Sequence, residues 1–118
     1  MPSLCMRGPY PLTAAKVDQT ISGRFPGNFA VGYLKESGAF VVRYVGRSDS
    51  DLNQAIKDYP ADDSTKFKWS YAEGAKEAFD RQCKAYHDFG GRARLDNETH
   101  PQPPDNTGWK CAFCDELG

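Results

Sequence analysis

The sequence predicts an α+β fold, in which a small, three-stranded and largely antiparallel sheet is flanked by helices and followed by an irregular C-terminal tail. Two β-type runs, at 29–34 and 39–45, are joined by a short loop that contains Gly38. This spacing is typical of a β-hairpin. A helical period then runs over 71–86, and the residues after 91 show no hydrophobic period. Strand pairing followed by a separate long helix favours the α+β class.

The other elements are predicted from local signals. An amphipathic piece at 14–21 is the helical candidate in the Pro- and Gly-rich first 26 residues. A Ser/Asp cluster at 48–51 starts a short helix that Pro60 ends, because proline cannot continue a helix. The alternating, aromatic segment 67–69 is the candidate for the third strand.

The long helix has a start signal and a stop signal. Ser70 and Glu73 have the spacing of a capping box, which predicts a helix start. Apolar positions then repeat with a 3.6-residue period, and Gly90-Gly91 ends the helix. We therefore expect a single domain over 1–118, with a core at about 26–90 and a tail at about 91–118.

Composition restricts the function. The 118 residues carry a formal net charge of −1, so nucleic-acid binding would have to come from a local basic patch. No apolar stretch approaches the roughly 20 residues that a membrane span needs, and the N-terminus lacks a secretory leader pattern. We therefore expect no membrane partner and a cytoplasmic protein, whose thiols stay reduced.

Two pairs of potential ligands predict a metal site. Cys111 and Cys114 form a CxxC pair, which is half of a tetrahedral zinc site. Cys83 and His87 stand at i and i+4 of the long helix, so they share one face. Together they predict a structural Zn²⁺ that anchors the tail, with His100 as the alternative to His87. The competing interpretation is a buried thiol, a surface histidine and a redox-active CxxC pair.

The hairpin and the segments after it resemble a known family. Gly27-Asn28-Phe29 opens the hairpin and Tyr44-Val45-Gly46 closes it, followed by Arg47-Ser48. With the later segments 79–89 and 95–101, this order of motifs is similar to the GIY-YIG nuclease superfamily, in particular a small bacterial and phage branch that ends in CxxC. The similarity covers about 26–114.

The resemblance implies metal-assisted hydrolysis of phosphodiesters, but several of the implied residues differ here. A motif tyrosine would activate water, and Tyr44 matches the second one, whereas Phe29 stands at the first. The helix arginine that binds phosphate would fall near Ala55. The glutamate that holds a divalent cation would fall near Gln82, and an amide is a poor anchor for a hard cation. Asn97 matches a late asparagine.

The leading functional prediction is therefore a zinc-stabilised, catalytically degenerate module that binds nucleic acid or a partner through its hairpin. One alternative is an active endonuclease that uses Tyr44, Arg47, a displaced carboxylate such as Glu73 or Glu77, and Mg²⁺. Another is a protein–protein interaction module, whose partner the sequence does not identify. The alternative to all three is that these basic and aromatic residues belong to an ordinary solvated face with scattered charge. The candidate contacts to DNA or RNA are Tyr33, Arg43, Arg47, Lys57 and Asn97, next to Lys66 and Lys68.

Overall fold

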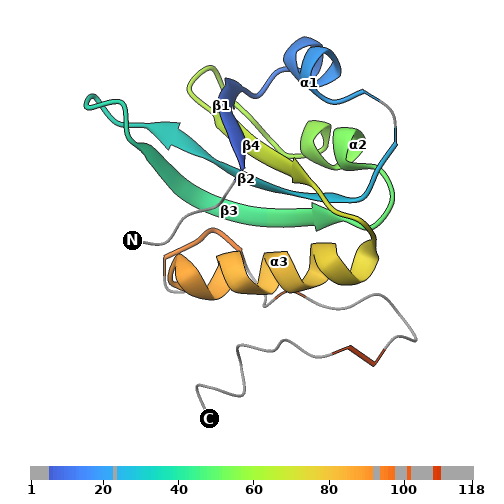
Figure 1. Cartoon of the computed structure of the whole chain (residues 1–118). Coiled ribbons are helices and arrows are strands. Elements are labelled where there is room, and N and C mark those ends of the chain that lie inside the picture. Colours follow the sequence, from blue (N-terminus) through green and yellow to red (C-terminus); the bar gives the residue numbers. More distant parts are fainter. Residues whose placement is uncertain (1–5, 23, 92–93, 98–100, 102–107, 110–118) are drawn as a thin grey trace.

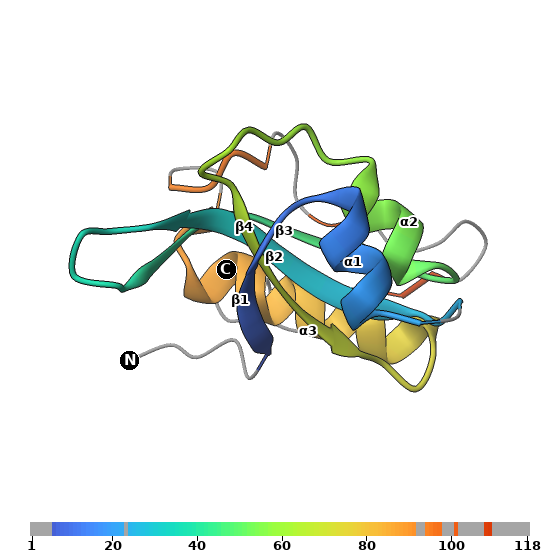
Figure 2. The same cartoon turned by 90° about the horizontal axis from the view of Figure 1, so that it is seen from above.

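One antiparallel sheet carries the fold, and helices cover both of its faces (Figure 1). In the spatial order β1-β4-β2-β3, the strands are β1 (Arg7–Pro11), β4 (Lys66–Tyr71), β2 (Gly27–Leu34) and β3 (Phe40–Ser48). Two short helices, α1 (Ala14–Thr20) and α2 (Leu52–Lys57), cover one face, and α3 (Ala75–Asp88) covers the other (Figure 2). The computed structural model describes residues 6–22, 24–91, 94–97, 101 and 108–109.

The predicted hairpin is confirmed as the antiparallel pair β2–β3. Ala30 lies opposite Val45, and the turn is closed by a 2.9 Å bond from the Lys35 amide to the Ala39 carbonyl. The register slips by one residue between Val31 and Gly32, which is a β-bulge. A Cβ at Gly32 would lie 1.8 Å from the Val41 carbonyl oxygen, so only glycine allows this close approach.

The predicted strand count is wrong, because the sheet has a fourth strand. Strand β1 pairs antiparallel with β4 and places Tyr10 opposite Phe67. The sequence pattern did not predict this strand because it contains Pro9 and Pro11, and proline is rare in central strands. They are tolerated here because β1 is an edge strand and pairs on one side only. The third predicted strand at 67–69 is confirmed, within the longer β4.

The predicted start of the long helix is also wrong. Ser70 belongs to β4, and α3 begins at Ala75 after Gly74, which makes no side-chain cap. Glu73 does not close a capping box; instead its amide donates to Glu77 Oε1 at 3.2 Å. Strand pairing with β2 continues through Tyr71 and takes up the residues that local pattern assigned to the helix. The predicted helix end is confirmed, since α3 stops before Gly90, whose φ is +95°.

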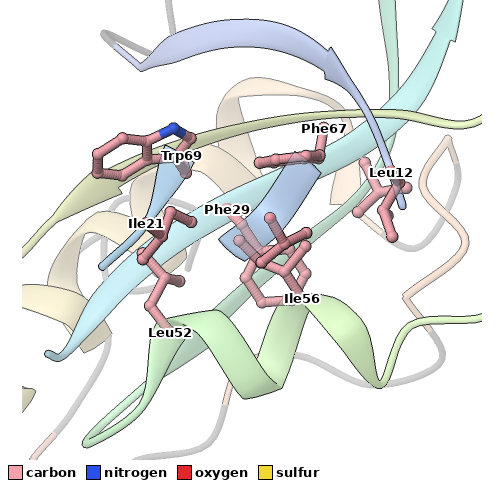
Figure 3. Packing of buried hydrophobic residues seen from close by; sticks show 9 residues of the cluster. Leu12, Ile21, Phe29, Leu52, Ile56, Phe67 and Trp69 are labelled. Carbon is pink, nitrogen blue, oxygen red and sulfur yellow. The ribbon is translucent and has the colours of Figure 1, made fainter. Parts of the chain in front are cut away.

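The larger core lies between the sheet and the helices α1 and α2 (Figure 3). Strand alternation sends every second side chain of β2 and β4 to this face, where they meet the apolar sides of the helices. Each of these side chains is less than a tenth exposed. The cluster consists of Leu12, Val17, Ile21, Phe29, Val31, Leu52, Ile56, Phe67 and Trp69.

The layer between the sheet and α3 mixes apolar and polar side chains. Ala30 and Val45 pack there against Ala85, Tyr86 and Leu95. A buried asparagine on β2, Asn28, donates from Nδ2 to the Ala78 carbonyl of α3 at 2.7 Å. This face of the sheet is therefore joined to its helix by hydrogen bonds as well as by apolar contacts.

The segment 94–97 caps the open edge of β3. Asn97 uses both ends of its amide on Val45: it donates from Nδ2 to the carbonyl at 2.8 Å and accepts from the backbone N–H at 3.0 Å. The Asp96 amide donates to the Arg43 carbonyl. Unpaired edge strands invite pairing with other chains, so this cap protects the sheet. We call it the Asn97 clamp.

Replacing Asn97 by Ala should destabilise the domain by about 1–3 kcal/mol, because both backbone groups of Val45 lose a buried partner. Chemical denaturation measures the free energy of unfolding, and hydrogen exchange measures protection of the Val45 amide. The exposed substitution Gln19→Ala on α1 is the control. If the Val45 amide of the Asn97→Ala variant is as well protected from hydrogen exchange as in the parent protein, the Asn97 clamp is contradicted.

Candidate functional site

Arg47 lies between the sheet and α3 and is held from several sides. Its Nη1 donates to Gln82 Oε1 at 2.7 Å, and its Nε donates to Asp49 Oδ1 at 3.0 Å. The guanidinium carbon lies 5.2 Å from the centre of the Phe79 ring. The side chain is only 12% exposed, so this arginine is part of the structure of the α3 layer.

Tyr44 lies on the other side of the sheet. Its ring centre is 6.0 Å from that of Phe29 and 5.0 Å from that of Tyr59, and it packs on the core beneath α1 and α2. Burial raises the pKa of the Tyr44 phenol above its usual value. The phenol is therefore neutral near pH 7 and poorly suited to take a proton from water.

The structure does not bring Tyr44 and Arg47 together. The two residues are three positions apart on one strand, and an odd separation points side chains to opposite faces. Their contacts agree, since Tyr44 touches Tyr59 next to α2 whereas Arg47 bonds to Gln82 on α3. The sheet itself separates the two residues that an endonuclease site was expected to combine.

The groups at the other positions that an endonuclease site was expected to use are engaged within the fold. Gln82 is only 8% exposed. Its Oε1 accepts a hydrogen bond from Arg47, and its Nε2 donates one to the Val45 carbonyl at 3.4 Å. The candidate substitute Glu77 pairs with Arg81 at 3.2 Å. The carboxylate that pairs with the Arg47 guanidinium is that of Asp49, which directly follows β3.

The five predicted nucleic-acid contacts are spread over different parts of the fold. Lys57 pairs with Asp18 between α2 and α1, and Asn97 is buried in its clamp. Arg43 pairs with Asp96 at 2.7 Å, which raises the pKa of its guanidinium. Tyr33 is 43% exposed on the α1/α2 side of the hairpin. Tyr33 and Arg43 line one pocket, but the five residues together do not form one continuous surface.

A different basic surface lies on the α3 side of the hairpin. Lys66 and Lys68 alternate with the core residues Phe67 and Trp69, so their side chains point to the opposite face of the sheet. The Lys68 ammonium lies 5.4 Å from the centre of the Phe40 ring. The sequence contained this signal, since two lysines that alternate with two buried aromatics must share one face.

Next to these lysines, an open groove of about 580 Å³ runs beside the end of α3. Exposed Leu34 lies opposite Phe40 in the hairpin pairing and extends the apolar surface. In Figure 1 the hairpin loop projects past both helical layers, so this end of the sheet is open. The groove is lined by residues 40–43 of β3 and by Phe89, Arg94 and Leu95. We call the surface formed by Leu34, Phe40, Lys66, Lys68 and Arg94 the hairpin face.

The cations of the hairpin face are not neutralised by the residues that the structure describes. Ion pairs engage seven of the described cations: Arg24, Arg43 (which also lines the groove), Arg47, Lys57, Lys76, Arg81 and Lys84. Within the same described ranges, Lys66, Lys68 and Arg94 form no ion pair, and the same holds for Arg7, Lys16 and Lys35 in other parts of the fold. Although the chain has a net charge of −1, three cations without ion pairs therefore lie on the hairpin face.

The predicted zinc ligands fall partly outside the described residues. Cys83 is fully buried on α3 beside Phe79 and Trp109, and the His87 ring lies against Tyr86. Cys111, Cys114 and His100 lie outside the residues described. Among those that are described, no group of three or more potential ligands comes together. The zinc site stays a prediction.

Comparisons with protein-family models, with curated proteins and with solved structures found no match. The resemblance to GIY-YIG nucleases therefore stays a prediction as well. In the described part of the chain, none of the helices has the length and apolar character needed to cross a membrane.

Replacing Arg47 by Ala should lower the free energy of unfolding by about 1–3 kcal/mol, because Gln82 loses its buried partner. The matched control is Arg43→Ala on the same strand, whose ion pair with Asp96 is half exposed and should matter much less. Chemical denaturation of both variants compares them directly. Equal effects would contradict a structural role for Arg47.

Proposed function

We propose that this chain is a non-catalytic module that binds single-stranded nucleic acid on the hairpin face. The observation that carries the proposal is a group of three cations without ion pairs beside an open groove with aromatic walls. Arg94 lines the groove, Lys68 lies over its Phe40 wall, and Lys66 shares the face of β4 with Lys68. Cations bind backbone phosphates, and aromatic rings stack with bases.

The groove offers both kinds of contact within one short surface. Phe40 and Phe89 are partly buried rings on its walls, and Lys68 lies over the first of them. Arg94 lines the same groove from the chain that follows α3. An unstacked strand presents bases and phosphates side by side, whereas the base edges of a duplex lie inside its grooves. This combination supports a single strand as the ligand.

The absence of catalysis is proposed from the arrangement around Arg47 and Tyr44. Hydrolysis of a phosphodiester needs a group that activates water and a cation or guanidinium close to the reacting phosphate. Here the neutral Tyr44 phenol and the Arg47 guanidinium lie in different layers, and Gln82 supplies an amide in place of a carboxylate. Oligonucleotides incubated with the protein and Mg²⁺ or Mn²⁺ should therefore remain intact.

We also propose that one structural Zn²⁺, bound by Cys83, His87, Cys111 and Cys114, fixes the tail to α3. Trp109 packs on the Phe79–Cys83 cluster, and the first cysteine of the CxxC pair follows only two residues later. This proximity supports the proposed ligand set. Such a site requires reduced thiols, so we propose the cytoplasm as its compartment.

The double variant Lys66→Gln/Lys68→Gln should bind a single-stranded oligonucleotide more weakly and with less dependence on salt. Each lost phosphate contact should lower the slope of log K against log salt by about 0.7 for a single strand. Fluorescence anisotropy at several salt concentrations measures both quantities. Lys76→Gln/Lys84→Gln removes the same charge from α3 and should bind like the parent protein. Equal binding by both double variants would exclude the hairpin face.

The zinc proposal predicts one zinc per chain in protein purified without added metal. Elemental analysis should show that Cys111→Ser or Cys114→Ser loses the metal, together with thermal stability, because binding the metal is coupled to ordering the tail. His87→Ala should release the metal as well, whereas His100→Ala should retain it. Retention of zinc in both cysteine variants would refute the proposed ligands.

A further inference from the structure

A second pocket lies on the α1/α2 side of the same hairpin and is chemically unlike the groove. Its volume is about 190 Å³, and two phenol rings, Tyr33 and Tyr59, form part of its wall. Arg43, Asp62 and Asp96 supply the charged groups, and Val31 contributes an apolar surface. We call it the tyrosine pocket. The zinc proposal and the hairpin face make no use of it.

Asp62 is a preorganised hydrogen-bond acceptor in this pocket. Its Oδ1 accepts from the Ser64 hydroxyl at 2.8 Å, the Ser64 amide at 2.9 Å and the Thr65 hydroxyl at 3.0 Å. These bonds hold the pKa of Asp62 below its usual value, so the group is ionised near neutral pH. Within the described residues none of these bonds uses Oδ2, which leaves that oxygen able to accept from a ligand.

Arg43 and Asp96 form a second, half-exposed polar group. They are joined by one bond, from Nη2 to Oδ1 at 2.7 Å, and their side chains are 45% and 50% exposed. The second carboxylate oxygen and further guanidinium N–H groups can therefore meet a ligand without breaking this pair. Two carboxylates against one guanidinium disfavour a phosphate inside the pocket, so the ligand group should be neutral and rich in donors.

These features fit a planar nucleobase. The rings of Tyr33 and Tyr59 offer surfaces for stacking, the carboxylates accept hydrogen bonds, and Arg43 donates them. Guanine alone among the common bases combines two adjacent N–H donors, suited to a carboxylate, with the O6 and N7 acceptors suited to a guanidinium. Adenine, cytosine and uracil each lack one of these pairs.

We infer that the tyrosine pocket binds one guanine of a single strand that lies on the hairpin face, an inference that rests on the proposed function. Arg43 lines both the groove and the pocket, at the bulged edge strand where the two faces meet. A strand that follows the groove can thus turn one base around this edge. The hairpin face would provide general affinity, and the pocket would provide base preference.

The test compares oligothymidylates that carry a single central guanine, adenine or cytosine, measured by fluorescence anisotropy. The guanine oligonucleotide should bind about fivefold or more tightly than the others, as expected for one added stacked base. Tyr33→Ala and Asp62→Asn should remove this preference and leave binding of plain oligothymidylate unchanged. Asparagine keeps the Oδ1 acceptor that holds the local turn. The matched controls are Tyr71→Ala, another exposed tyrosine, and Asp63→Asn, which changes the same charge.

The outcomes separate this inference from the proposed function. The parent protein could bind all three oligonucleotides equally, while the Lys66→Gln/Lys68→Gln variant binds them all more weakly. This result would overturn the guanine pocket and leave the hairpin face intact. If the parent protein binds none of the oligonucleotides, both the guanine pocket and the proposed function are overturned. GMP and N-acetylarginine amide test the pocket alone by NMR titration. Shifts of the Tyr33 and Tyr59 ring signals with GMP are expected, and shifts with the arginine derivative only would overturn the inference in favour of a basic peptide.

Discussion

The burial of β2 on both faces is the constraint on which the rest of the structure depends. Its first six residues, 27–32, are all buried, although they alternate between the two sides of the sheet. Phe29 and Val31 require the layer formed by α1 and α2, and Asn28 and Ala30 require α3. The last two residues, Tyr33 and Leu34, extend beyond both layers and are exposed. The fold therefore produces a packed end and an open end of the same hairpin.

The two ends of the hairpin carry different chemistry for this reason. At the packed end Arg47 is engaged by Gln82 and Asp49 and is only slightly exposed, so its charge is used within the fold. Lys66 and Lys68 lie opposite Gly32 and Ala30 of β2, and the Lys68 ammonium extends toward the Phe40 ring near the open end. Alternation along β3 also keeps Tyr44 away from Arg47. The separation of Tyr44 from Arg47, and the placement of Lys66 and Lys68 on the α3 side, thus follow from one pattern of strand faces.

Local pattern predicted the parts of the fold that depend on neighbours in sequence. The hairpin and the Gly90 stop of α3 follow from short-range turn and cap chemistry, and both are present. The other parts of the fold depend on contacts between residues that are far apart in the sequence. Ser70 continues β4 because β2 lies beside it, and the proline-bearing β1 is a strand because the sheet edge needs no second partner. The role of Asn97 depends on Val45, 52 positions away, and no periodicity can indicate such a bond.

The candidate site could be predicted only in part, for a similar reason. The alternation in β4 was sufficient to place the two lysines on one face, but the sequence could not show which cations the fold neutralises. Arg43 and Lys57 looked equivalent to Lys68 as basic residues near aromatics, yet both meet an aspartate from a distant segment. Uncompensated charge is a property of the folded chain, and it changed the expected surface from one spread around Tyr44 to the hairpin face.

The most direct test of the binding surface is chemical-shift mapping of the ¹⁵N-labelled protein with an oligothymidylate. We predict that the perturbed amides cluster at Leu34, Phe40, Lys66 and Lys68 and around the end of α3, and that the outer faces of α1 and α2 stay unchanged. Perturbations centred on α1 and α2, or none at saturating oligonucleotide, would contradict a nucleic-acid site on the hairpin face.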